Sequence, residues 1–272
     1  MPEIIRPFQL IRSPRIAILD FDGTLSLLRS GWVEIMVGMM IDVLRPLPGT
    51  NESDAELTEY VSDFVLNMTG RATVFQMEYF VNAAKERGGH PESPDYYTQE
   101  FLDALNQKAE QRIALLKAGK VAIDDLLVPG ARTLLIDLQA RGVQMTLASG
   151  TPVEIVRREA ELLNIAHFFE GRIFGPEEDW RAFSKLNVMR DILANANADG
   201  ADLLGLGDGF VETENAKQLG GVAIGCATDE TSRSGRIEDW KRTRLIKAGA
   251  DVIVADYCNW HKLTELLFPN RI

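Results

Sequence analysis

The sequence has few of the residues that build disulfide frameworks, zinc sites and membrane spans. Its two cysteines, Cys226 and Cys258, lie far apart and outside any C-x-x-C pattern, which gives structural disulfides and zinc sites little support. Its three histidines, His90, His167 and His261, are scattered, so a histidine-rich metal site is not expected. No uninterrupted apolar run reaches the roughly 18 residues of a transmembrane helix.

Positive charge is also in short supply. Lysine and arginine number 29 against 40 acidic residues, which gives a formal net charge of −11. Non-specific nucleic-acid binding is therefore not expected, because it needs a basic surface. The N-terminal residues 1–7 lack the charged and apolar regions of a signal peptide. With so little cysteine, the reducing cytoplasm is the expected compartment.

From about residue 128 onward, the pattern alternates between strands and helices. Thr151 is expected to cap one of these helices, with Pro152 at its first position. The alternation predicts an α/β fold, a doubly wound, Rossmann-like parallel sheet with helices on both faces. Helices are expected over 131–141, about 152–163, 185–195 and 211–219, strands over 143–148, 203–206, 221–225 and 252–254, and a short strand or hairpin over 168–174.

Residues from about 30 to 125 have apolar side chains at helical spacing and few strand signals. The simplest interpretation is a helical domain inserted after the first strand. We therefore expect a catalytic core formed by 1–28 and 126–272, and a helical cap formed by 29–125.

The first strand is expected over Ile16–Leu19, and Asp20, Asp22 and Gly23 follow it directly. In open α/β sheets, ligands bind at the carboxyl ends of the strands. Two close carboxylates repel each other unless a cation or a shared proton relieves them. Mg²⁺ suits such a pair, because it takes one or two carboxylates and keeps several waters.

Two other structures can contain this pattern. Asp-Gly alone is common in hairpin turns. An EF-hand loop with its glycine at Gly23 would place Ile18 at position one and Arg29 at position twelve, and neither can bind Ca²⁺ there. The EF-hand alternative therefore fails, and polar residues further along the chain favour a functional site over a hairpin.

Polar residues recur at three equivalent places, each after a strand or at the start of a helix. They are Ser149 with Gly150, Lys185, and Asp208 within Gly-Asp-Gly. Such positions can converge in one crevice of a doubly wound sheet. A metal and Lys185 would neutralise a phosphate, while Ser149 and the Gly150 amide would hold its oxygens.

Each of these signals is weak by itself. Gly-Asp-Gly is usually a turn, and a single lysine usually lies on the surface. A dinucleotide-binding fingerprint fails because Phe210 replaces its third glycine, and a nucleophile elbow fails because Leu147 replaces a glycine. The order of all four sites on alternating α/β units is what favours phosphoryl transfer.

In that order, the residues resemble the motifs of the haloacid dehalogenase superfamily, of the helical-cap type that includes phosphoglycolate phosphatases and beta-phosphoglucomutases. Asp20-Phe21-Asp22-Gly23-Thr24 matches the first motif, and Ser149, Lys185 and Asp208 match the next three. The resemblance implies that Asp20 is a nucleophile forming an aspartyl-phosphate and that Asp22 is the general acid and base. It further implies Mg²⁺ bound by Asp20, the Asp22 carbonyl and Asp208, with Lys185 orienting Asp20.

The chain departs from the family pattern at two positions. Glu212 stands where a second aspartate is common, and it could lie behind the metal ligands or bind the metal directly. Lys185 follows Ser184 and precedes Leu186 in place of the common Lys-Pro-x-Pro run.

Within the family, Asp22 favours hydrolysis of a phosphomonoester, because dehalogenases lack this acid. A phosphomutase on a sugar phosphate uses the same core, and a non-catalytic binding or regulatory protein is a third alternative. A cap implies a small phosphorylated metabolite as partner, with no nucleic acid or membrane; the oligomeric state stays open. Candidate cap contacts are Arg29, Trp32 and Arg71, the last of which could equally be a solvated loop residue.

Overall fold

The computed structural model describes residues 1–7, 10–68, 73–177 and 183–269, and the chain divides into two compact units. One unit joins Met1–Ser30 to Leu115–Ile272, and the other is Gly31–Ala114, inserted between them. The second change of unit falls inside helix α4 (Pro94–Lys117), before the boundary at residue 125 that we expected.

In the described residues, the first unit is built on a seven-stranded sheet with the order β1-β7-β6-β5-β2-β3-β4. Neighbouring strands are parallel, except that β1 pairs antiparallel with β7. This confirms the predicted α/β class. The strands are β1 (Glu3–Ile4), β2 (Ile16–Leu19), β3 (Gln144–Ala148), β4 (Ile173–Phe174), β5 (Leu203–Gly207), β6 (Val222–Cys226) and β7 (Val252–Val254).

The central strands β2 and β5 lie side by side, with Leu19 opposite Leu206. Both are continuous apolar runs and buried throughout, as expected for strands covered by helices on both faces. From β2 the chain proceeds to β3 and β4 on one side, and then crosses to β5, β6 and β7 on the other. The order therefore reverses at β2 and β5, and ligands bind at such a switch point in open α/β sheets.

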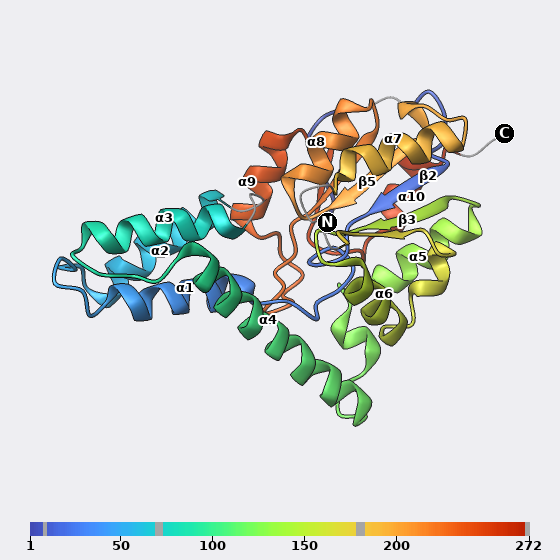
Figure 1. The fold of residues 1–272 in the computed structure, drawn as a ribbon. Coiled ribbons are helices and arrows are strands. Elements are labelled where there is room, and N and C mark those ends of the chain that lie inside the picture. The colour runs from blue at the N-terminus through green and yellow to red at the C-terminus, as the bar shows by residue number, and fades with distance from the viewer. Residues whose placement is uncertain (8–9, 69–72, 178–182, 270–272) are drawn as a thin grey trace. The chain divides into compact units, whose positions relative to one another are not determined.

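Helices cover both faces of this sheet (Figure 1). Helices α5 and α6 lie on the opposite side of the strands from α7 and α8. Met189 and Ile192 of α7 are buried with Ile16 and Ile18 of β2, so α7 packs directly on the central strand. The helices are α5 (Ala131–Ala140), α6 (Val153–Leu162), α7 (Lys185–Asn195), α8 (Phe210–Gln218), α9 (Asp239–Ala248) and α10 (His261–Leu267).

The segment 168–174 differs from the expected strand or hairpin. A short 3₁₀ helix, Ala166–Phe169, comes first, and the two-residue strand β4 follows. Further 3₁₀ helices span Ile123–Leu126 and Gly200–Asp202. Among the described residues, no helix combines the length and the apolar character that a membrane span requires.

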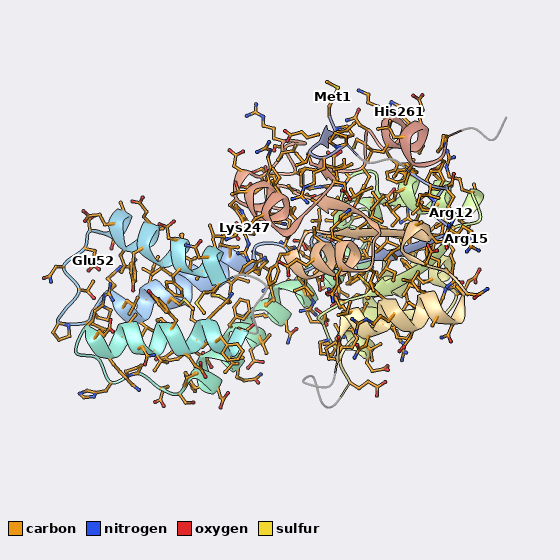
Figure 2. All side chains as sticks on the ribbon, turned by 90° about the horizontal axis from the view of Figure 1, so that it is seen from above. Met1, Arg12, Arg15, Glu52, Lys247 and His261 are labelled. Atoms are coloured by element: carbon orange, nitrogen blue, oxygen red, sulfur yellow. The ribbon has the colours of Figure 1, made fainter. Side chains whose placement is uncertain are left out.

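The inserted unit is helical, as the residue spacing predicts. Its helices are α1 (Trp32–Leu44), α2 (Asp54–Met68), α3 (Thr73–Glu86) and the first part of α4. Met36, Met40, Phe64 and Phe80 belong to one buried cluster that joins these helices. Glu52 (labelled in Figure 2) accepts a hydrogen bond of 2.7 Å from Arg87, which ties the α1–α2 loop to the end of α3.

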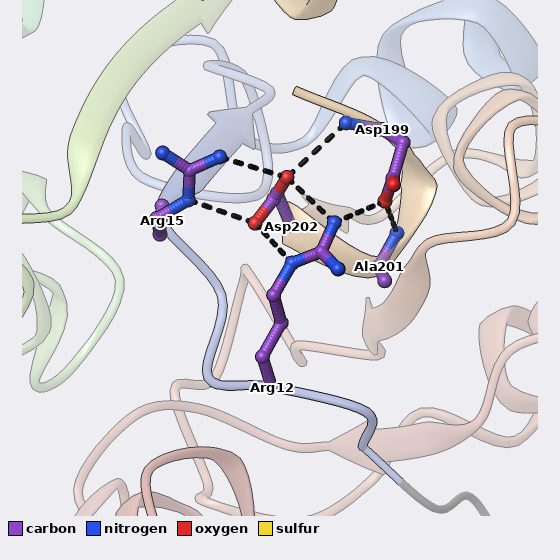
Figure 3. Close-up of polar contacts among 5 residues, drawn as sticks. All are labelled: Arg12, Arg15, Asp199, Ala201 and Asp202. Atoms are coloured by element: carbon purple, nitrogen blue, oxygen red, sulfur yellow. Dashed lines mark hydrogen bonds and ion pairs between the residues drawn. The ribbon is translucent and has the colours of Figure 1, made fainter. Parts of the chain in front are cut away.

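At the amino end of the central strands, one buried carboxylate joins two chain segments (Figure 3). Asp202, just before β5, accepts hydrogen bonds from Arg15 at 2.8 and 3.0 Å and from Arg12 at 2.7 and 2.9 Å. Since Arg15 directly precedes β2, this cluster holds the starts of β2 and β5 together. Two strands fixed at their starts also bring their carboxyl ends together.

Candidate active site

A tight loop follows β2 and carries the first motif. The carbonyl of Phe21 accepts hydrogen bonds from the amides of Leu25 and Ser26, at 2.8 and 2.9 Å. Gly23 closes this loop with φ of +69°, a left-handed conformation that favours glycine. The loop thus holds Asp20 and Asp22 at the carboxyl edge of the sheet.

The loop after β5 is attached to this first loop. The backbone N–H of Asp208 donates to the hydroxyl of Thr24 at 2.9 Å. A Cβ atom on Gly23 would lie 2.3 Å from Oδ2 of Asp208, so the missing side chain makes room for this carboxylate. The glycine and threonine of the first motif therefore position Asp208 as well as their own loop.

Lys185 and Asp20 form the central ion pair of the site. Nζ of Lys185 donates to Oδ1 of Asp20 at 2.8 Å and also to Oε1 of Glu212, in the first turn of α8. Burial alone would lower the pKa of Lys185, but the two carboxylates outweigh it and raise the pKa. The lysine is therefore a fixed positive charge beside Asp20. The structure places Glu212 against Lys185.

Asp20 lies in a buried environment, with only 8% of its surface exposed. Burial raises its pKa well above the ordinary value, and the ammonium of Lys185 opposes that shift. A carboxylate in this position gains stability from each additional positive charge.

Asp22 has different partners. Its Oδ2 accepts a hydrogen bond of 2.7 Å from the hydroxyl of Thr151, and Nε of Arg29 lies 3.9 Å from its Oδ1. Burial raises the pKa of Asp22, and Arg29 opposes the shift. Our expectation that Thr151 caps α6 was wrong: Pro152 is the N-cap residue there, and the Thr151 hydroxyl is engaged by Asp22.

Ser149 and Gly150 follow β3 at the same edge. Ser149 is buried, and its Oγ accepts a hydrogen bond of 3.0 Å from the amide of Thr151. Because that bond uses only an acceptor site of Oγ, the hydroxyl proton can still donate to a ligand. Gly150 is exposed.

Three charged residues of this cluster, Glu159, Glu230 and Lys241, were not predicted from the sequence. Lys241, in the first turn of α9, donates to Oδ2 of Asp208 at 2.9 Å and to Oε1 of Glu230. Glu230 lies in the loop after β6. That position was a usable signal, because Asp20, Asp22 and Asp208 also lie in loops that follow strands of the sheet.

The structure describes two of the three residues that we expected to contact the substrate from the cap. Arg29 belongs to the unit that contains the sheet, and its guanidinium donates to Glu159 of α6 at 2.8 Å. It is therefore a partly buried residue of the core unit, which corrects its placement in the cap. Trp32, the first residue of α1, packs against the core of the helical unit. Arg71 lies outside the described residues.

The charged side chains of the active site carry an excess of negative charge that a bound cation could balance. Their ion pairs join six carboxyl groups to three basic side chains, a formal excess of three negative charges. Within the described ranges, no three His, Cys, Asp or Glu side chains form a group that could hold a metal. Mg²⁺ needs only one or two carboxylates, and Asp20 and Asp208 can supply them. The residues present therefore fit a divalent cation.

A buried aspartate at the switch point of a parallel sheet, paired with a lysine at a helix start and accompanied by two further aspartates, is typical of an α/β enzyme of the phosphoryl-transfer type. The model of the haloacid dehalogenase-like hydrolases matches residues 14–220. The chain belongs to this family and is a hydrolase of it, which confirms the family and enzyme class expected from the motifs. A search of curated proteins found no match.

Solved structures share the fold at low sequence identity. A "predicted phosphoglycolate phosphatase" from Haemophilus somnus 129pt is 14% identical, with a TM-score of 0.59 over 93% of this chain and 99% of that one. A family member from Deinococcus radiodurans R1, solved with bound phosphate and sodium, is 14% identical with a TM-score of 0.58, over 95% and 99%. A protein provisionally named a beta-phosphoglucomutase, from Bacteroides vulgatus, is 15% identical with a TM-score of 0.54, over 94% and 90%.

Proposed function

We propose that the chain hydrolyses the phosphomonoester of a small metabolite, with Mg²⁺ as cofactor and an aspartyl-phosphate as intermediate. The observation that carries this proposal is the different surroundings of the two aspartates after β2. Asp20 is held by a lysine ammonium, and Asp22 by a threonine hydroxyl. Carboxyl groups with different surroundings are suited to different roles in one reaction.

In the first step, a carboxylate oxygen of Asp20 attacks phosphorus, and the bond from phosphorus to the ester oxygen breaks. Asp22 gives its proton to that leaving oxygen. In the second step, Asp22 takes a proton from water as the water oxygen attacks phosphorus, and the bond from phosphorus to the Asp20 oxygen breaks. The products are an alcohol and inorganic phosphate, and both aspartates return to their starting states.

Other residues bind and orient the phosphate. Ser149 Oγ and the Gly150 amide would donate to its oxygens, and Lys185 would hold Asp20 while it neutralises charge. Mg²⁺, held by Asp20, Asp208 and the carbonyl of Asp22, would supply further neutralisation of the phosphate when bound. Glu212 keeps Lys185 in place from the other side.

The structural relatives support the same chemistry. One of them is described as a "predicted phosphoglycolate phosphatase", and another was solved with phosphate and sodium bound. The experiment that tests the proposal is phosphate release from p-nitrophenyl phosphate, with and without Mg²⁺. A magnesium-dependent rate that Asp20→Asn abolishes supports hydrolysis, whereas an unchanged rate in that variant contradicts it. A folded chain that binds phosphate without turnover would favour a binding or regulatory role.

A phosphomutase is the second candidate, because one relative is provisionally named as such and uses the same fold. In a mutase, a second hydroxyl of the sugar takes the phosphoryl group in place of water. Incubation with a sugar phosphate distinguishes the two, since a hydrolase releases inorganic phosphate and a mutase forms an isomer.

We further propose that the helical unit, with Trp32 and Arg71, selects a small phosphorylated metabolite, and that neither nucleic acid nor a membrane is a partner. The formal charge of −11 supports the exclusion of nucleic acid. A panel of phosphorylated metabolites assayed for phosphate release tests this selection. A chain that prefers no metabolite over p-nitrophenyl phosphate would contradict it.

A further inference from the structure

The site contains a second buried lysine that none of the four motifs includes. Only 3% of the side chain of Lys241 is exposed, and its ammonium lies between the carboxylates of Asp208 and Glu230. The arrangement resembles that of Lys185 between Asp20 and Glu212. In each case, one lysine connects a motif aspartate to a glutamate from another part of the sheet edge.

Glu230 lies close to the first motif as well as to Lys241. A Cβ atom on Gly23 would lie 2.9 Å from its Oε1 and 2.8 Å from Cγ of Asp208. The two carboxylates therefore lie together over the glycine of the first loop. Two partly buried carboxylates this close repel each other, and the ammonium of Lys241 relieves that repulsion.

The charge of this lysine is firmly held. Burial alone would lower the pKa of Lys241, but Asp208 and Glu230 outweigh it and raise the pKa. The ammonium of Lys241 lies 2.9 Å from one oxygen of Asp208. Any cation that binds the other oxygen of Asp208 does so beside this charge.

We propose that Lys241 and Glu230 are positioning residues that set the affinity of the site for its divalent cation. Lys241 fixes the carboxylate of Asp208 and repels the cation, and Glu230 compensates by neutralising part of the lysine charge. This inference rests on the proposed magnesium-dependent function, in which Asp208 is a metal ligand.

The two residues should then act in opposite directions. Removing the lysine charge leaves the carboxylates of Asp208 and Glu230 without a counter-charge, and a divalent cation becomes their best partner. Removing the glutamate charge leaves Lys241 to act on Asp208 alone, and the cation is repelled more strongly. Charges this close and this buried are screened only weakly by solvent.

The test is a titration of the purified full chain with Mn²⁺ at fixed pH and ionic strength, with free Mn²⁺ measured by electron paramagnetic resonance. We expect Lys241→Met to lower the Kd and Glu230→Gln to raise it, each by roughly tenfold. This is the smallest change in metal affinity that is typical when a residue that holds a metal ligand is replaced. The control is Lys217→Met, because Lys217 of α8 also forms an ion pair with a buried carboxylate, that of Asp251, at 2.7 Å. That control should leave the Kd unchanged.

The inference would be overturned if the Kd for Mn²⁺ shifted in the same direction in both site variants, or in neither. A purely structural bridge would affect the Kd in the same direction whichever of its two residues is changed. If Lys241→Met does not fold, as judged by circular dichroism, the near-isosteric Glu230→Gln decides alone: a raised Kd supports the inference and an unchanged Kd overturns it. An unmodified chain that binds no Mn²⁺ would contradict the metal-dependent reaction too, whereas binding with unshifted variants contradicts this inference alone.

Discussion

Nζ of Lys185 lies 2.8 Å from Oδ1 of Asp20, although 165 positions of sequence separate the two residues. The contact exists because β2 ends at the switch point of the sheet and α7, which begins at Lys185, packs on the same strand. It gives the candidate nucleophile a fixed positive neighbour. Variants of this pair and of the residues around it therefore test the proposed chemistry directly.

Lys185→Met should lower kcat by roughly 100-fold, the size expected when one preorganised charged donor is removed from an active site. The measurement is steady-state phosphate release. Ser184→Ala is the matched control, because Ser184 caps the same helix by accepting from the amide of Asn187 at 3.3 Å. It should reduce stability by about 1 kcal/mol with little change in kcat. Equal activity losses in both variants would show that only the helix start matters.

Asp22→Asn should affect substrates according to their leaving groups. In the first turnover, measured as the burst of released alcohol, an alkyl phosphate, whose alcohol needs a proton, should lose far more rate than p-nitrophenyl phosphate, whose leaving group needs little protonation. Thr151→Val should show the same pattern more weakly, because the hydroxyl that holds Asp22 is gone, and Thr151→Ser should restore the rate. Equal losses for both substrates in Asp22→Asn would argue against a general acid at this position.

Gly23→Ala should abolish activity and Mn²⁺ binding, since the new methyl group would meet Asp208 at 2.3 Å. Gly142→Ala is the matched control, because Gly142 has a similar φ of +70° with no atom within 4 Å of the added Cβ. Both variants should lose about 1–2 kcal/mol from the left-handed backbone, as measured by denaturant unfolding. Retained Mn²⁺ binding in Gly23→Ala would contradict the close approach of Asp208.

Acid should weaken the cluster that joins the starts of β2 and β5. The guanidinium groups of Arg12 and Arg15 lower the pKa of Asp202 below its ordinary value of 3.8. A lowered pKa in the folded state adds stability above pH 3.8 and loses it as the pH falls further. Asp202→Asn should therefore destabilise the protein at pH 7, and this cost should decrease progressively as the pH falls below 3.8, in denaturant unfolding. Asp199→Asn, which alters an exposed partner, should have a smaller effect, and a pH-independent cost for Asp202→Asn would contradict the account.

Regular elements with strong local signals could be predicted from the sequence. The expected helix over 185–195 and strand over 252–254 have those bounds in the structure. Helices α9 and α10 were not predicted, and α9 has too polar a sequence for apolar spacing to reveal it. The antiparallel strand β1 is only two residues long and depends on its partner β7 rather than on a local pattern.

The residues of the site were predictable where they follow a strand, and their partners were not. Lys185 could be chosen only through its order among the motifs, since a lone lysine has no local signal. Thr151 has the pattern of a helix cap, and only the tertiary contact with Asp22 decides its role. Glu159 and Lys241 lie on helices rich in charged residues, where a single charged side chain is expected to be exposed. Each is nevertheless buried, because it pairs with an oppositely charged side chain from a distant segment of the chain.

The central claim is that Asp20 carries the phosphoryl group during turnover. The most direct test uses Asp22→Asn with p-nitrophenyl phosphate and Mg²⁺, because the good leaving group departs without an acid while hydrolysis of the intermediate lacks its base. After an acid quench, mass spectrometry of the digested chain should find one phosphoryl group on the peptide that contains Asp20. Hydroxylamine should remove it, and Asp20→Asn should never acquire it. A phosphoryl group on another residue, or nitrophenol release from a chain that carries none, would contradict the account.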